Sequence, residues 1–151
     1  MQINHIHVEN YKTYLNLDLD ISVKSEDRPI LLIGGMNGSG KTTLFDAIYS
    51  ALYGLNINGE AHFRELFNSG VQDITGKRIV LEVEFEGIVT NTLTKYKLRR
   101  TYQILNGKPR ENVTLYIGGN TYSYGTHTPS KEKSLNEQAV SKIIKANLPS
   151  E

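Results

Sequence analysis

The sequence contains no cysteine among its 151 residues. Disulfide bonds, zinc–thiolate sites and cysteine nucleophiles are therefore excluded, and only oxygen and nitrogen chemistry remains. Long apolar runs are also missing, because no stretch approaches the ~18 residues that a membrane-spanning helix needs. The first four residues, MQIN, lack the basic and apolar regions of a signal peptide. We therefore expect a soluble, cytoplasmic protein without a membrane partner.

Internal repeats, heptads and low-complexity segments are absent too, so the chain encodes no coiled coil. A length of 151 residues suits one domain and is too short for two ordinary ones. The modest hydrophobic content of 38% would suit a piece of a larger protein whose missing partner covers part of its surface.

Charge is balanced overall but divided along the chain. The net charge is +1, yet residues 1–87 carry 7 Lys/Arg and 12 Asp/Glu, whereas residues 88–151 carry 10 and 4. A basic half is typical of proteins that bind polyanions, and it also occurs in ordinary domains. Polyanion binding is therefore one open interpretation.

Alternation of apolar and polar residues predicts strands in both halves of the chain. These strands are expected at residues 2–9, 14–22, 79–86, 96–104 and 113–117. The last three form an antiparallel meander, with Asn106-Gly107 as a hairpin turn. A continuous apolar run from Ile30 to Ile33 predicts a central strand that is covered on both faces.

Apolar residues at helical spacing predict helices at residues 41–53 and 61–67, and Gly54 ends the first of them. Residues 134–137 form a capping box that predicts a third helix, with Pro149 beyond its end. The order of these elements predicts an α/β fold with a mixed sheet and an antiparallel β-subdomain.

A glycine loop between the expected strand 30–33 and the helix 41–53 matches the pattern G-x-x-x-x-G-K-[ST]. Glycines let successive backbone N–H groups converge on an anion, and the following helix N-terminus favours negative charge. Lys41 is expected to reach the β and γ phosphates, Thr42 to bind Mg²⁺ and Thr43 to bind the α-phosphate. The alternative is a turn without a ligand, but the flanking strand and helix favour Mg-ATP. The expected nucleotide-binding residues are Gly35, Asn37, Gly38, Ser39, Gly40, Lys41, Thr42 and Thr43.

An acidic pair after a buried apolar strand, which hydrolysis of ATP usually requires, is missing from the sequence. The acidic residues of 80–86 alternate with apolar ones and are typical of a solvated face. We therefore expect no catalytic residue within this chain, which carries half of an ATPase site.

These residues together resemble the N-terminal lobe of SMC-like ABC ATPase heads, over nearly the whole chain. The resemblance implies that the α/β fold is of the P-loop NTPase type. The similarity lies in the turn Tyr11 to Tyr14, the glycine loop and the helix after it. Gly34-Gly35 and Arg99 to Tyr102 are similar to DndD, the ATPase of DNA phosphorothioation systems, whereas Met36 and the lack of tryptophan depart from that pattern. An SbcC-type repair ATPase is the alternative within the group.

The resemblance implies that the chain is an N-terminal lobe, residues 1–151, of a longer polypeptide. The helix that ends in Lys142 to Pro149 is similar to the one that precedes the Q-loop of this group. The Q-loop, coiled coil, signature motif, acidic pair and C-terminal lobe would all follow Glu151. Expected partners are that C-terminal lobe, a second head in a homodimer, DNA and other proteins of a modification or repair system.

The resemblance also places further residues near the ligands. Lys12 would lie close to the nucleotide phosphates or base, and an exposed turn lysine is the alternative. Arg64 would approach nucleotide or DNA, unless it is a solvated residue on a short helix. Asp46 is expected to form packing contacts or hydrogen bonds and not to bind metal.

A row of cations, Lys95, Lys97 and Arg99, follows one side of the strand 96–104 at a spacing of about 6.6 Å, from a rise of ~3.3 Å per residue. Such a row is suited to DNA phosphates, with binding that weakens as salt rises. The alternative is a charged edge strand that discourages aggregation. Tyr122 and Tyr124 are expected to pack and not to stack on bases.

Two other classes of protein stay open at this point. A self-contained P-loop kinase would need an acidic strand and an arginine-rich lid, which the sequence does not show. A nucleotide-gated binding module without hydrolysis would need the loop and the basic face alone.

Overall fold

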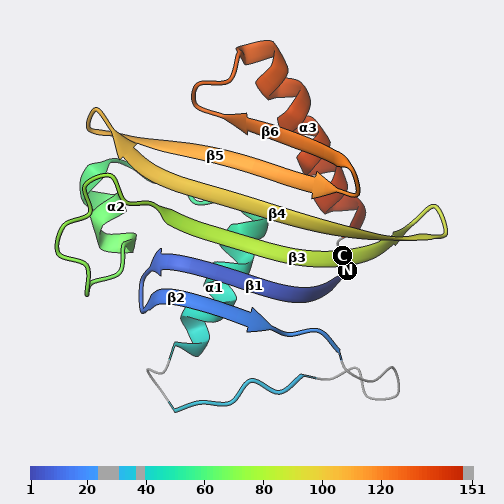
Figure 1. Ribbon diagram of the computed structural model, residues 1–151, viewed down its shortest axis with the longest axis horizontal. Coiled ribbons are helices and arrows are strands. Elements are labelled where there is room, and N and C mark those ends of the chain that lie inside the picture. Colours follow the sequence, from blue (N-terminus) through green and yellow to red (C-terminus); the bar gives the residue numbers. More distant parts are fainter. Residues whose placement is uncertain (24–30, 37–39, 148–151) are drawn as a thin grey trace.

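One antiparallel sheet forms the body of the protein (Figure 1). The computed structural model describes residues 1–23, 31–36 and 40–147, and within them six strands are ordered β2-β1-β3-β4-β5-β6. The strands are β1 (Gln2–Tyr11), β2 (Tyr14–Asp20), β3 (Ile79–Val89), β4 (Thr92–Leu105), β5 (Lys108–Ile117) and β6 (Asn120–Gly125). The helices are α1 (Lys41–Tyr53), α2 (Glu60–Leu66) and α3 (Ser130–Asn147).

The alternation of the sequence gives the sheet one apolar face and one polar face. Cross-strand pairing aligns Ile6 with Val83, Val83 with Leu98 and Leu98 with Leu115, and all four side chains are fully buried. Neighbouring positions in each strand point the other way and carry charged or polar side chains. We call this second side the outer face.

The apolar face is covered by helices. α1 crosses behind β1 and β3 in Figure 1, and α3 lies along β6 and reaches β3. The small side chains of Ala47 and Ala51 on α1 are fully buried, which lets the helix approach the sheet closely. Phe63 fixes the short α2 in the same core. None of the helices in the described part of the chain is long and apolar enough to cross a membrane.

The α/β class is confirmed, and so are the strands expected near 2–9, 14–22, 79–86, 96–104 and 113–117. The expected division into a mixed sheet and a separate antiparallel part is not seen, because every strand pair described is antiparallel within one sheet. β6 was not expected. Its signal is the short alternation of Tyr122 and Tyr124 after Gly118-Gly119, and both tyrosines pack against the core as expected.

The central strand expected at 30–33 is wrong for its described part, Leu31 to Ile33, which has no strand structure. Leu32 is 89% exposed, so the run is not covered on both faces. A continuous apolar run becomes a buried strand only where neighbours pair with it and cover it, and no described strand does so here.

The third helix begins at Ser130, four residues before the expected capping box. The amide of Lys133 donates to the carbonyl of Pro129, so the helical hydrogen bonds already start at the proline. Proline is favourable at a helix start because its missing N–H has no partner there anyway. Ser134 therefore lies inside α3 and does not cap it.

Gly87 of β3 lies against Asn147 at the end of α3. A β-carbon at this position would collide with the Oδ1 of the buried Asn147 at the end of α3. We expect Gly87→Ala to lower the free energy of unfolding by about 1–3 kcal/mol, the usual cost of overpacking. Chemical denaturation measures it. The double variant Gly87→Ala/Asn147→Ala should recover most of the loss, and strict additivity of the two substitutions would contradict the contact.

Candidate phosphate-binding site

Among the described residues, no side chain forms a capping hydrogen bond to the backbone donors at the N-terminus of α1. Gly40 caps the helix with φ 98°, a left-handed conformation, and it has no side chain to bond the first turn. The first helical hydrogen bond runs from the Leu44 amide to the Gly40 carbonyl oxygen at 2.9 Å. The amides of residues 41–43 come before this bond and have no helical carbonyl to donate to. No acidic residue lies in the first turn. These amides and the helix dipole favour an anion.

The side chain of Lys41 turns back to the start of the glycine loop. Its ammonium donates to the carbonyl oxygen of Gly35 at 2.5 Å. This bond brings the first glycine of the motif and its lysine together, and a bound phosphate would offer the ammonium a charged acceptor instead. Asn37, Gly38 and Ser39 lie outside the described residues.

The turn between β1 and β2 contacts the end of the loop. Tyr14 donates from its hydroxyl to the carbonyl of Gly40 at 2.9 Å. A β-carbon at position 40 would lie 2.8 Å from that hydroxyl oxygen and 3.4 Å from Oγ1 of Thr13. Glycine is therefore needed for its conformation and for the close approach. The sequence singles out the turn that contains Tyr14 but does not predict this role for its hydroxyl.

The same turn binds the second turn of α1 through Asp46. The Tyr11 hydroxyl and the Lys12 ammonium each donate to Oδ2 of Asp46 at 2.5 Å. Partial burial raises the pKa of Asp46, but the bonds from Lys12 and Tyr11 outweigh it and leave the pKa lowered. The bond to Asp46 raises the pKa of Lys12, and burial followed by that carboxylate raises the pKa of Tyr11.

Lys12 is thus a half-exposed lysine held at the side of α1. It adopts φ 49° in the turn, and its amide donates to the carbonyl of Leu66. Asp46 forms hydrogen bonds, as expected. The geometry brings Lys12 to the helix of the glycine loop, and its contact with nucleotide remains a prediction.

Thr42 and Thr43 lie in the first turn of α1, with Thr42 exposed and Thr43 half-buried. Among the described residues, no group of three histidine or carboxylate side chains is arranged to hold a metal ion. Magnesium that arrives with a nucleotide needs few protein ligands, because phosphate oxygens and water supply the rest. Thr42 is exposed beside the first amides of α1, so its hydroxyl fits that requirement and is the ligand the site would offer.

The expected cationic row is present on the outer face but is largely paired. Lys97 and Arg99 both contact Glu82 of β3, at 3.7 Å and 2.9 Å, and Glu82 is buried by them. Lys95 lies opposite Glu86 and is exposed. The alternative of a charged edge strand is wrong, because β4 lies between β3 and β5.

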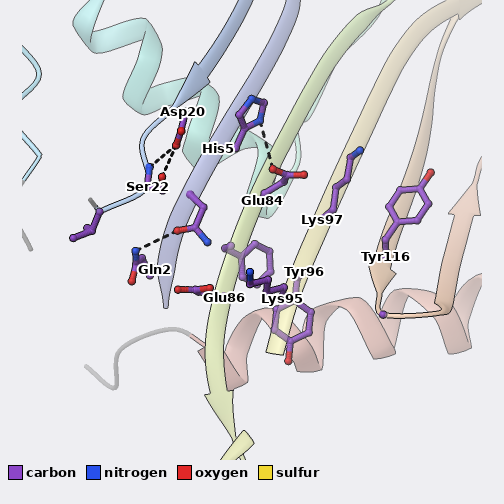
Figure 2. Close-up of a pocket in the computed structure, with 14 residues that line it drawn as sticks. Gln2, His5, Asp20, Ser22, Glu84, Glu86, Lys95, Tyr96, Lys97 and Tyr116 are labelled. Carbon is purple, nitrogen blue, oxygen red and sulfur yellow. Dashed lines mark hydrogen bonds and ion pairs between the residues drawn. The ribbon is translucent and has the colours of Figure 1, made fainter. Parts of the chain in front are cut away.

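An open hollow of about 650 Å³ lies on this face beside the row. Figure 2 shows Glu84, Lys97 and Tyr116 projecting from three adjacent strands at its floor. His5 of β1 contacts Glu84 at 3.8 Å and also Asp18 of β2. The outer face therefore has an acidic side over β1–β3 and a basic side over β4.

Arg64 is exposed on α2. In the described part of the chain, no hydrogen bond or ion pair joins its side chain to the glycine loop or to the cationic row. α2 itself is connected to the β1–β2 turn, since Asn68 donates to the carbonyl of Lys12 at 2.9 Å. A role for Arg64 in binding nucleotide or DNA remains a prediction.

The glycine loop, the free helix N-terminus and the α/β architecture define a P-loop type of domain. The family model AAA_23, described as AAA domain, matches residues 5–149. The chain therefore belongs to the AAA_23 family.

Three similar curated proteins are much longer than this chain. It is 30% identical over 138 residues to the "DNA double-strand break repair Rad50 ATPase" of Methanocaldococcus jannaschii, covering 91% of the chain and 11% of that protein. It is 43% identical over 51 residues to the SbcC subunit of the nuclease SbcCD of Staphylococcus epidermidis, and 32% identical over 99 residues to that of Staphylococcus aureus. These alignments cover 34% and 64% of the chain, and 5% and 9% of the relatives. The chain spans about a tenth or less of the curated relatives it matches.

A solved structure described as "Structural biochemistry of ATP-driven dimerization and DNA stimulated activation of SMC ATPases" is also similar. It shares 18% identity at a TM-score of 0.45, with 92% of this chain and 80% of that chain covered.

Proposed function

We propose that the chain is the ATP-binding N-terminal lobe of a DNA-associated, SMC-like ATPase. The observation that carries the proposal is the loop closed by Lys41 on Gly35 at the free N-terminus of α1. The amides of residues 40–43 would bind the phosphates, Lys41 would neutralise the β and γ oxygens, and Thr42 would hold Mg²⁺. Magnesium would supply charge neutralisation at the phosphates.

A C-terminal lobe of the same polypeptide would cover the apolar surface that residues 1–151 leave open. Phe45 and Tyr49, four residues apart on α1, are 59% and 63% exposed, and Leu32 and Met36 before the helix are 89% and 85% exposed. Large apolar side chains gathered around one helix are typical of an interface.

Hydrolysis would require groups that this chain lacks in sequence, namely an acidic pair for magnesium and water. Those groups would come from the C-terminal lobe, and a second head in a homodimer would supply a signature motif across the nucleotide. ATP would then favour the engaged dimer, and hydrolysis would release it. Such a protein would work in the cytoplasm on DNA.

The particular parent we propose is a DndD-type ATPase of DNA phosphorothioation systems, on the Gly34-Gly35 pair and the Arg99 to Tyr102 strand. The alternative is an SbcC-type repair ATPase that works with a nuclease. The names of the curated relatives, a Rad50 ATPase and SbcC components of a nuclease, support this alternative equally well. Genes beside the parent gene separate the two, since sulfur-transfer enzymes indicate the first and a nuclease the second.

Calorimetry with Mg-ATP and a steady-state ATPase assay on residues 1–151 test the proposal. Binding of Mg-ATP without turnover is expected, with Mg-AMP much weaker because it lacks the β and γ phosphates. Robust turnover by these residues alone would contradict the half-site proposal and favour a self-contained enzyme. Absence of binding would refute the nucleotide site.

Substitution of Glu82 tests whether DNA binds through Lys95, Lys97 and Arg99. Because Glu82 occupies two of the three cations, Glu82→Gln should release them and raise affinity for duplex DNA roughly 3- to 10-fold at low salt. Fluorescence anisotropy measures the change, and Lys97→Gln/Arg99→Gln should act in the opposite direction. Equal affinity in all three proteins would exclude this row as the DNA contact.

A further inference from the structure

The C-terminal end of α1 is held by an arginine from the sheet. Arg100 of β4 is only 4% exposed. Its Nε donates to the carbonyl of Ala51 and its Nη2 to the carbonyl of Leu52, both at 2.8 Å. The last carbonyls of a helix lack intrahelical donors, and here one guanidinium supplies two of them from a distant part of the sequence.

Neighbouring side chains complete this arrangement. The amide of Leu55 donates to the hydroxyl of Tyr102 at 2.9 Å. Glu111 of β5 lies 3.9 Å from Arg100 Nη1. Burial, followed by the charge of Glu111, raises the pKa of Tyr102. Gly54 has φ 90°, and a β-carbon there would lie 3.2 Å from Arg100 Nη1, so the helix end is fitted to the arginine.

This position matters because α1 is the helix whose other end forms the phosphate-binding site. A helix of 13 residues behaves as a rod of about 20 Å at ~1.5 Å per residue. A change in the anchor at one end therefore tilts or shifts the amides at the other. The cation also offsets the negative end of the helix dipole, which leaves the positive end less compensated.

Two neighbouring arginines of β4 make different contacts on opposite sides of the sheet. Arg99 points to the outer face, where it contacts Glu82, whereas the next residue, Arg100, points inward to α1. A polyanion that binds the outer cations would therefore act on the strand that holds the helix. The alternation of side chains gives a direct physical connection between the two faces.

We propose that Arg100 is a positioning residue for nucleotide binding, which fixes α1 so that its N-terminal amides and Lys41 meet the phosphates. The proposal rests on the proposed ATP site. Its mechanism is geometric, because the guanidinium binds the far end of the helix from the one that would hold the nucleotide. In the sequence alone, Arg100 is only one member of a basic strand.

The test is the Kd for Mg-ATP of Arg100→Met, measured by calorimetry at a temperature where circular dichroism shows the protein folded. We expect affinity to fall roughly 2- to 30-fold, the range of coupling through a packed network. Arg100→Lys should recover part of the loss, because an ammonium still reaches one of the carbonyls. Tyr102→Phe, a milder change at the same helix end, should weaken binding less, and it carries the test if Arg100→Met does not fold.

A matched control separates positioning from general destabilisation. Leu115 is fully buried on β5, and Leu115→Ala should lower the melting temperature while leaving the Kd unchanged. An equal loss of affinity in Leu115→Ala, or unchanged affinity in both Arg100→Lys and Tyr102→Phe, would overturn the proposal. Failure of the wild-type protein to bind Mg-ATP would instead refute the nucleotide site itself.

Discussion

Replacing Lys41 with alanine should weaken Mg-ATP binding by about 100-fold or more, the scale of a charge-assisted contact to phosphate in a partly desolvated site. In the proposed site, this ammonium would be the single cation that the glycine motif places among the β and γ oxygens. The substitution also removes the 2.5 Å bond to Gly35, so the ends of the loop lose their contact. The free energy of unfolding should change little, since this end of the side chain is exposed.

Calorimetric titration with Mg-ATP measures the loss, with Lys77→Ala as the control. Lys77 is an exposed lysine in a turn, so its removal changes net charge by the same amount without touching the loop. Retention of affinity in Lys41→Ala would refute the assignment of the site. A similar loss in Lys77→Ala would show that net charge, and not the position of the ammonium, governs binding.

Gly40→Ala should be the second most damaging change at the site. An L-residue at φ 98° is strained by roughly 1–2 kcal/mol, and its β-carbon would lie 2.8 Å from the Tyr14 hydroxyl oxygen. Relief of either strain rotates the carbonyl of Gly40 and the amides after it away from the anion. We expect affinity for Mg-ATP to fall about 10- to 100-fold, as each misplaced donor removes a charge-assisted bond.

Gly119→Ala is the matched control for this glycine. No atom lies within 4 Å of a β-carbon at position 119, so the substitution should leave binding unchanged. Addition of Tyr14→Ala to Gly40→Ala relieves the collision but not the backbone strain, and it should recover only part of the affinity. Full recovery would assign the whole effect to the contact with Tyr14.

Most of the fold could be predicted from the sequence because its sheet has one apolar, buried face and one polar, outer face. The alternation in Leu81 to Glu86 follows from that arrangement, and Glu82 departs from it because it is buried where Lys97 and Arg99 contact it. β6 was not predicted because its alternation spans only two tyrosines, and the third helix begins earlier than predicted because Pro129 starts the helical bonds. The prediction for the segment after residue 30 was wrong because burial depends on neighbours that the run itself does not encode.

Some residues of the candidate site could also be predicted from the sequence, and others could not. The glycine motif is local, so its residues could be predicted directly. The roles of Tyr14 and Glu82 could not, because each depends on pairing between elements far apart in the sequence. A glutamate opposite Arg99 becomes predictable only once the register of β3 and β4 is known.

α1 is bound to the sheet at both ends. Near the loop, Tyr14 bonds to Gly40, and Tyr11 and Lys12 bond to Asp46 of the helix. At the other end, Arg100 bonds to the last carbonyls. Sliding of the helix along the sheet would break all of these bonds at once. In the proposed ATPase, motion driven by ATP would therefore rotate the N-terminal lobe as a rigid body about its contacts with neighbouring domains. The conformational change of such a protein would then occur at the contacts between domains, while the interior of this lobe keeps the same structure.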